Sequence, residues 1–108
     1  GSRLTGRLGD DLTLEQGQEA ARLTAIALLS SLKAELGDLN KVKRIVKVLG
    51  MVQSAPGFKD QPKVMNAFSD LMVEVFGEKG KHSRSAVGVT ALPANWATEI
   101  EMVVEVED

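Results

Sequence analysis

Residues 83–106 read SRSAVGVTALPANWATEIEMVVEV, and this stretch decides most of the predicted fold. Its second part, 98–106, alternates strictly, with apolar side chains from Ile100 to Val106 on one face and mainly glutamates on the other. Its first part, 83–90, alternates less strictly. Period-two alternation is typical of strands. Because only the turn Pro93-Ala94-Asn95 and a few neighbours separate the two strands, we expect them to pair as an antiparallel hairpin.

A long helix is predicted upstream, beginning at Thr13. Thr13 and Gln16 form a capping box, in which each side chain bonds the other residue's backbone N–H. Gly37 ends the helix, since glycine readily adopts the left-handed conformation found just past a helix end. The apolar stripe of this helix comprises Ala21, Ala25, Leu28, Leu29, Leu32 and Leu36.

A strand over 42–52 and a second helix follow. We expect the strand to place Val42, Arg44, Val46, Val48 and Val52 on one face, and Lys43, Ile45, Lys47, Leu49 and Met51 on the other. Both faces are partly apolar, as in a strand covered on both sides. The second helix begins near Pro62 and ends at Gly77. Its apolar stripe, predicted to be core, comprises Val64, Phe68, Leu71, Met72, Val75 and Phe76.

The order helix, strand, helix, strand, strand predicts a two-layer α+β domain. In this arrangement two amphipathic helices pack on one face of a mainly antiparallel sheet. A sheet of three strands is small for two long helices to pack on. We therefore expect further strands or other subunits to complete it, and an open strand edge favours such association.

Length and composition narrow the class of protein. The chain has 108 residues, a net charge of −2 and no cysteine. Residues 3–108 are expected to form a single domain, and Gly1-Ser2 resembles a remnant of tag cleavage. The charge does not favour a nucleic-acid or membrane partner. The absence of cysteine fits a reducing compartment, so we expect a cytoplasmic location. No disulfide or thiolate metal site is possible.

No motif in the sequence identifies a reaction by its spacing alone. His82 is the single histidine, which excludes a multi-histidine metal site, and we expect it to be exposed in a loop. Arg84 begins a strand beside an apolar run, where a guanidinium can hold a carboxylate through two parallel hydrogen bonds or simply extend into solvent. Glu101 lies among glutamates on one strand face. One such carboxylate can position a water, although an acidic face is more often only solvated.

Several segments in collinear order carry a family resemblance. They are Arg84-Ser85-Ala86-Val87-Gly88-Val89, Ala91-Leu92-Pro93, Glu99-Ile100-Glu101, Asn66-Ala67, Gly37-Asp38-Leu39 and Thr5-Gly6-Arg7-Leu8. Together they cover nearly the whole chain. The sequence resembles a divergent branch of the YjgF/Rid (reactive intermediate deaminase) family.

The resemblance implies a chorismate-mutase-like fold and a homotrimer with ligand clefts between subunits. It implies hydrolysis of reactive enamines and imines to 2-keto acids and ammonia, without a metal or organic cofactor. By the same resemblance Arg84 binds the substrate carboxylate and Glu101 helps to place the water. Family members begin with a β-hairpin that contributes to the sheet and the cleft, and this sequence is expected to begin after it.

Three functions are therefore considered. The first is an enamine/imine deaminase that uses Arg84 and Glu101. The second is a non-catalytic, oligomeric module of the same fold that binds a small carboxylate or a protein partner. The third is an RNA-acting protein, because some relatives carry an endoribonuclease label. Neither the net charge nor the aromatic content of 4% favours the third.

Overall fold

The computed structural model describes residues 5–108; Gly1 and Ser2, interpreted above as a tag remnant, lie outside this part. Within it the order is helix, strand, helix, strand, strand, as predicted. The elements are α1 (Leu14–Leu36), β1 (Val42–Gln53), α2 (Gln61–Phe76), β2 (Ser83–Val89) and β3 (Thr98–Val106), with short 3-10 turns η1 (Leu39–Lys41), η2 (Gly77–Gly80) and η3 (Pro93–Asn95). No helix in residues 5–108 has the length and apolarity needed to cross a membrane.

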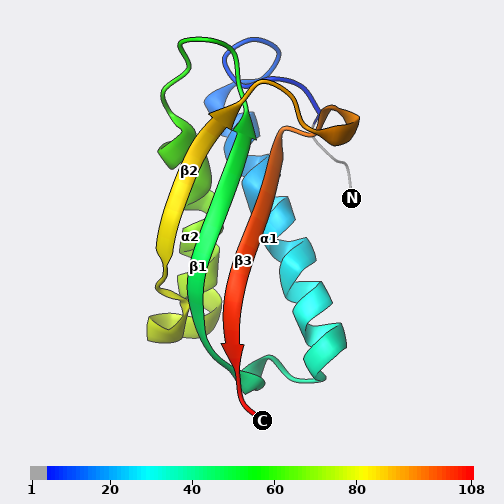
Figure 1. Ribbon diagram of the computed structural model, residues 1–108, viewed down its shortest axis with the longest axis vertical. Helices are drawn as coiled ribbons and strands as arrows, with labels where there is room; N and C mark the ends of the chain where they lie inside the picture. Colours follow the sequence, from blue (N-terminus) through cyan, green and yellow to red (C-terminus); the bar gives the residue numbers. More distant parts are fainter. Residues whose placement is uncertain (1–4) are drawn as a thin grey trace.

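The sheet has the strand order β2-β1-β3, so the predicted hairpin between the last two strands is wrong. The central strand β1 pairs in parallel with β2 and antiparallel with β3 (Figure 1). The reason is the helix between β1 and β2. Strand, helix and strand form a βαβ unit, in which α2 carries the chain back so that β2 runs alongside β1 in the same direction. The two-layer α+β class is confirmed, with a mixed sheet.

The link over residues 90–97 crosses the end of β1, and Gln53 holds it there. This side chain is 2% exposed. Its Nε2 donates to the Gly6 carbonyl oxygen at 2.8 Å and to Asn95 Oδ1 at 2.7 Å, while its Oε1 accepts from the Leu92 N–H at 2.7 Å. One buried amide therefore joins the N-terminal segment, the end of β1 and the crossover link.

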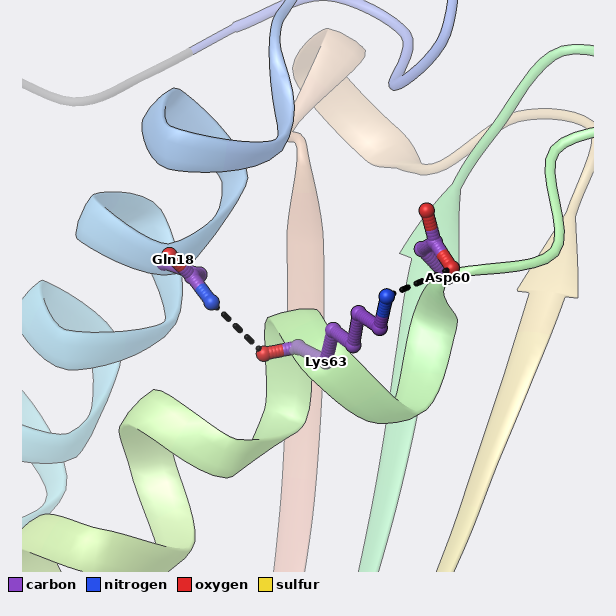
Figure 2. A network of polar contacts seen from close by, with 3 residues as sticks. All are labelled: Gln18, Asp60 and Lys63. Atoms are coloured by element: carbon purple, nitrogen blue, oxygen red, sulfur yellow. Dashed lines mark hydrogen bonds and ion pairs between the residues drawn. The ribbon is translucent and has the colours of Figure 1, made fainter.

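Both helices lie on the same side of the sheet, behind it in Figure 1. The predicted capping box of α1 is present: Thr13 Oγ1 accepts from the Gln16 N–H, and Gln16 Oε1 accepts from the Thr13 N–H. Gln18 of α1 also donates to the Lys63 carbonyl oxygen of α2 at 3.1 Å (Figure 2). Lys63 forms an exposed ion pair with Asp60, at 3.8 Å.

The core lies between the helices and the sheet. The residues that β1 contributes to it differ from those predicted. The register of β1 shifts between Val42 and Arg44 and again between Ile45 and Lys47. These irregularities place Val42, Ile45 and Val48 in the core, so the prediction that put Ile45 on the other face is wrong. From α2 the predicted core residues Val64, Phe68, Leu71 and Met72 are buried, whereas Val75 is exposed.

The second face of the sheet carries no helix within residues 5–108 and is turned toward the viewer in Figure 1. Val87 of β2 and Val103 of β3 are 43% and 59% exposed. Leu49 and Met51 of β1 are half-buried and belong to this face by strand alternation. We call this face of the sheet, on which these four apolar residues lie, the open face. The sequence indicated a strand covered on both sides, and within residues 5–108 only one side is covered by helices.

Candidate functional site

Arg84 lies near the start of β2, one of the two edge strands, and its side chain is on the helix side of the sheet. Its backbone is paired with that of the buried Val48. Its Nη1 donates to Asn66 Oδ1 at 3.0 Å and to Ser69 Oγ at 3.1 Å, both on α2. Nη1 is therefore the anchored end of the guanidinium. Nη2 and Nε make no hydrogen bond to residues 5–108.

A pocket of about 240 Å³ opens beside this arginine, between α2 and the start of β2. It is lined by Ser69, Val73, Lys81, His82 and Arg84. Lys81 is paired with Glu78 at 2.8 Å. Within the described part of the chain no carboxylate lies within 4.0 Å of the Arg84 guanidinium. The pocket is thus lined by a cation that is fixed at Nη1 and has no carboxylate partner in residues 5–108. Such a guanidinium can pair with an anionic ligand.

His82 is not the exposed loop residue expected from the sequence. It precedes β2, as predicted, but is half-buried. Its Nε2 lies 2.9 Å from Ser69 Oγ, and its Nδ1 lies 2.7 Å from the Gly80 carbonyl oxygen. Its ring meets the buried Phe68 ring edge-on, with centroids 6.4 Å apart. The correction follows from α2, which packs its Phe68 and Ser69 side against this residue.

Glu101 lies on β3, and the structure does not bring it to Arg84 within one chain. Its backbone is paired with Leu49, so by strand alternation its side chain is on the open face, whereas Arg84 faces the helices. β1 also lies between their two strands, which separates those backbones by roughly 10 Å. One chain therefore cannot direct both side chains at a single small molecule.

Sequence reasoning assigned no role to Asn66 or Ser69, and the signal for them was weak. They are three residues apart on α2, beside the apolar stripe, which places both on one side of that helix. His82 and Arg84 are two residues apart, which places both on one face of a strand. Only the parallel pairing of β2 with β1, which the sequence analysis missed, brings these two pairs together.

A second pocket, of about 360 Å³, lies where the parallel strands β1 and β2 end. Polar groups of Arg7, Ser54 and Gln61 line it. Arg7 Nη2 donates to the Thr90 carbonyl oxygen at 3.1 Å, which ties the N-terminal segment to the crossover link. In residues 5–108 no group of three or more His, Asp or Glu side chains is placed to hold a metal ion.

The comparisons with known proteins agree with this architecture. The chain is 47% identical to Protein TCP17 of Trypanosoma cruzi over 109 residues, covering 100% of the chain and 68% of that protein. The crystal structure of Atu1372 from Agrobacterium tumefaciens, a protein described as having unknown function, superposes with a TM-score of 0.94 at 43% identity. The match covers 96% of this chain and 68% of that one.

A crystal structure described as a putative endoribonuclease from Shewanella oneidensis superposes with a TM-score of 0.91 at 31% identity. It covers 94% of this chain and 68% of that one. The family model described as YjgF/chorismate_mutase-like, putative endoribonuclease, matches residues 2–106. With its two helices on one face of a mixed sheet, and with this match over nearly its whole length, the chain belongs to the YjgF/chorismate-mutase-like family.

Proposed function

We propose that this protein binds a small 2-imino or 2-keto acid by its carboxylate at Arg84 and hydrolyses the imine to a 2-keto acid and ammonia. The observation that carries the proposal is the state of the Arg84 guanidinium. Nη1 is fixed by Asn66 and Ser69, and Nη2 and Nε make no hydrogen bond to residues 5–108. Arg84 also lines a pocket and has no carboxylate partner in the same residues. A planar fork held in this way suits two parallel hydrogen bonds to one carboxylate.

The reaction needs a water molecule at the imine carbon. A bond forms between the water oxygen and that carbon, the carbon–nitrogen bond breaks, and the water protons leave with nitrogen as ammonia. A carboxylate that accepts a proton from the water and returns it to the leaving nitrogen lowers the barrier of both steps. Glu101 is proposed for this role.

Because Glu101 and Arg84 lie on opposite faces of the sheet, the proposal includes assembly. A second copy of the chain must bring its Glu101 to the Arg84 pocket of the first. The exposed Val87 and Val103 give the open face an apolar surface that favours such contact. We propose a homo-oligomer, a trimer by resemblance to the family, with each site shared between copies.

The test of the binding step is the dissociation constant of pyruvate, measured by calorimetry, for the protein and for Arg84→Lys. Lysine keeps the charge but loses the bidentate fork. We expect the dissociation constant to rise about tenfold, the effect of losing one charge-assisted hydrogen bond. Arg22→Lys, at an exposed position on α1, is the matched control. Unchanged affinity in Arg84→Lys would refute the assignment of Arg84.

A non-catalytic member of the fold that binds a carboxylate ligand or a protein partner is the second candidate. The separation of Arg84 from Glu101 within one chain favours it, because binding needs only the arginine. This candidate predicts normal pyruvate affinity together with no imine hydrolysis. RNA cleavage, named in the family description, is not favoured by the net charge of −2 or the aromatic content of 4%.

A further inference from the structure

Arg84, Ser69 and His82 form a chain of hydrogen bonds that ends on the backbone. Ser69 Oγ lies 3.1 Å from Arg84 Nη1 and 2.9 Å from His82 Nε2. His82 Nδ1 lies 2.7 Å from the Gly80 carbonyl oxygen. The three side chains come from β2, α2 and the residue before β2, so the chain of bonds crosses between the helix and the sheet.

The positions of the protons follow from which groups can donate. A carbonyl oxygen only accepts, so His82 Nδ1 must carry the proton that meets Gly80. In a neutral imidazole Nε2 is then an acceptor, and the Ser69 hydroxyl must donate to it. The lone pairs of Ser69 Oγ are left for Arg84, whose guanidinium can only donate. Each donor along this chain of bonds therefore meets an acceptor.

The backbone end of this chain is held firmly. Gly80 is buried and packs against the Met72 carbonyl oxygen so closely that a β-carbon there would overlap it. Phe68, fully buried, supports the imidazole ring edge-on at an interplanar angle of 76°. The carbonyl oxygen that His82 meets therefore belongs to a buried, closely packed residue, and the ring beside it is fully buried.

We propose that Ser69 and His82 are positioning residues, which hold the Arg84 guanidinium at the angle that presents Nη2 and Nε to a carboxylate. This inference rests on the proposed role of Arg84 in ligand binding. His82 sets the direction of the Ser69 hydroxyl, and Ser69 in turn fixes Arg84 Nη1. Lys81, which also lines the pocket, pairs with Glu78.

The first test is the tautomer of His82, read by two-bond ¹H–¹⁵N correlation NMR at pH 8. The chain has one histidine, so the signals need no assignment. We expect Nδ1 to carry the proton and Nε2 to be unprotonated. A protonated Nε2 with a bare Nδ1, or a fast average of the two tautomers, would overturn the proposal, since Ser69 would then not be oriented by the ring.

The second test compares pyruvate binding across two pairs of variants. Ser69→Ala removes the hydroxyl and His82→Leu removes the acceptor. In each we expect the dissociation constant to rise about five- to tenfold, the effect of losing about one hydrogen bond. Ser69→Thr keeps a hydroxyl, and His82→Gln keeps an acceptor oxygen near the Nε2 position. Both should stay within about twofold of the parent.

Ser30→Ala, at an exposed position of α1, is the control for serine removal, and the melting temperature of each variant checks folding. Normal pyruvate affinity in Ser69→Thr and His82→Gln separates positioning from a merely structural role. If the two residues only stabilised the fold, affinity would follow the melting temperature of each variant and would not depend on whether the hydroxyl or the acceptor is kept. Unchanged affinity in Ser69→Ala and His82→Leu, with weakened affinity in Arg84→Lys, would overturn this inference alone. Unchanged affinity in Arg84→Lys would overturn both this inference and the proposed function.

Discussion

Gly80 links the stability of the domain to the geometry of the site. Its α-carbon approaches the last turn of α2 so closely that a β-carbon would overlap the Met72 carbonyl oxygen, and a backbone atom cannot turn away as a flexible side chain can. The same residue's carbonyl oxygen accepts from His82. Gly37 is different. It adopts a φ of 81° at the end of α1, and no atom lies within 4 Å of the place where a β-carbon would be. Glycine suits this position because of its backbone conformation, and not because another atom packs closely against it.

At the residue scale we therefore expect Gly80→Ala to lower the free energy of unfolding by about 1–3 kcal/mol through overpacking. Gly37→Asn should cost less than about 1 kcal/mol, because asparagine is the other residue often found in the left-handed position after a helix. Urea unfolding of both variants measures the difference. Equal losses of stability in the two variants would contradict this expectation, because the contact with Met72 would then not be the cause of the loss in Gly80→Ala.

At the scale of single elements, the positions of the helices and strands follow from local signals, whereas their pairing does not. Thr13 with Gln16, and the glycine after each helix, placed the helix ends to within a residue or two. The pairing of β2 with β1 depends on α2, and the order of the strands depends on a link held by one buried glutamine. The alternation of apolar and polar residues within a strand reveals neither the role of α2 nor that of the link. The hairpin expected from this alternation was therefore wrong.

The core pattern of β1 could not be predicted for a similar reason. Strict alternation cannot place Val42, Ile45 and Val48 on one face, and the two register shifts that do so arise from pairing with β3. For the candidate site, the sequence and its family resemblance indicated Arg84. They did not indicate Ser69 or the partly buried hydrogen bonds of His82, because these depend on how α2 lies across β2.

Gln53 offers the test at the element scale. Gln53→Leu removes three hydrogen bonds and leaves the Leu92 N–H and the Gly6 carbonyl oxygen without that partner. We expect the free energy of unfolding to fall by about 2–4 kcal/mol, given the cost of leaving buried polar groups unpaired. Gln18→Leu loses one exposed bond to Lys63 and should change stability by less than about 0.5 kcal/mol. Similar losses in both variants, measured by urea unfolding, would contradict the role given to Gln53.

At the scale of the whole molecule, the elements of residues 5–108 cover one face of the sheet and leave the other open, and we expect the open face to cause self-association. Val103→Lys should raise the dissociation constant of the oligomer about tenfold, since a charge would replace an exposed apolar side chain at the contact. Ile26→Lys alters a side chain that is 45% exposed on α1, away from this face, and should leave association unchanged. Sedimentation equilibrium gives both values. A monomer at every concentration of the parent protein would exclude a shared site.

The proposed shared site makes the reaction depend on this assembly, because only a second copy can bring Glu101 to Arg84. Val103→Lys should therefore reduce imine hydrolysis as it reduces association, while pyruvate binding at Arg84 persists. The ratio of activity to oligomer fraction, followed over protein concentration, measures this coupling. Full activity in a monomeric variant would contradict the placement of Glu101 in the neighbouring copy.

The most direct measurement is the hydrolysis of 2-iminopropanoate, generated in the assay by an amino-acid oxidase, with the protein and with Arg84→Ala. We expect the protein to accelerate the loss of the imine above the buffer rate and Arg84→Ala to abolish this acceleration. A rate equal to buffer, from a protein that is folded and binds pyruvate, would contradict the deaminase function and leave the carboxylate-binding module. Acceleration that persists in Arg84→Ala would contradict the site itself.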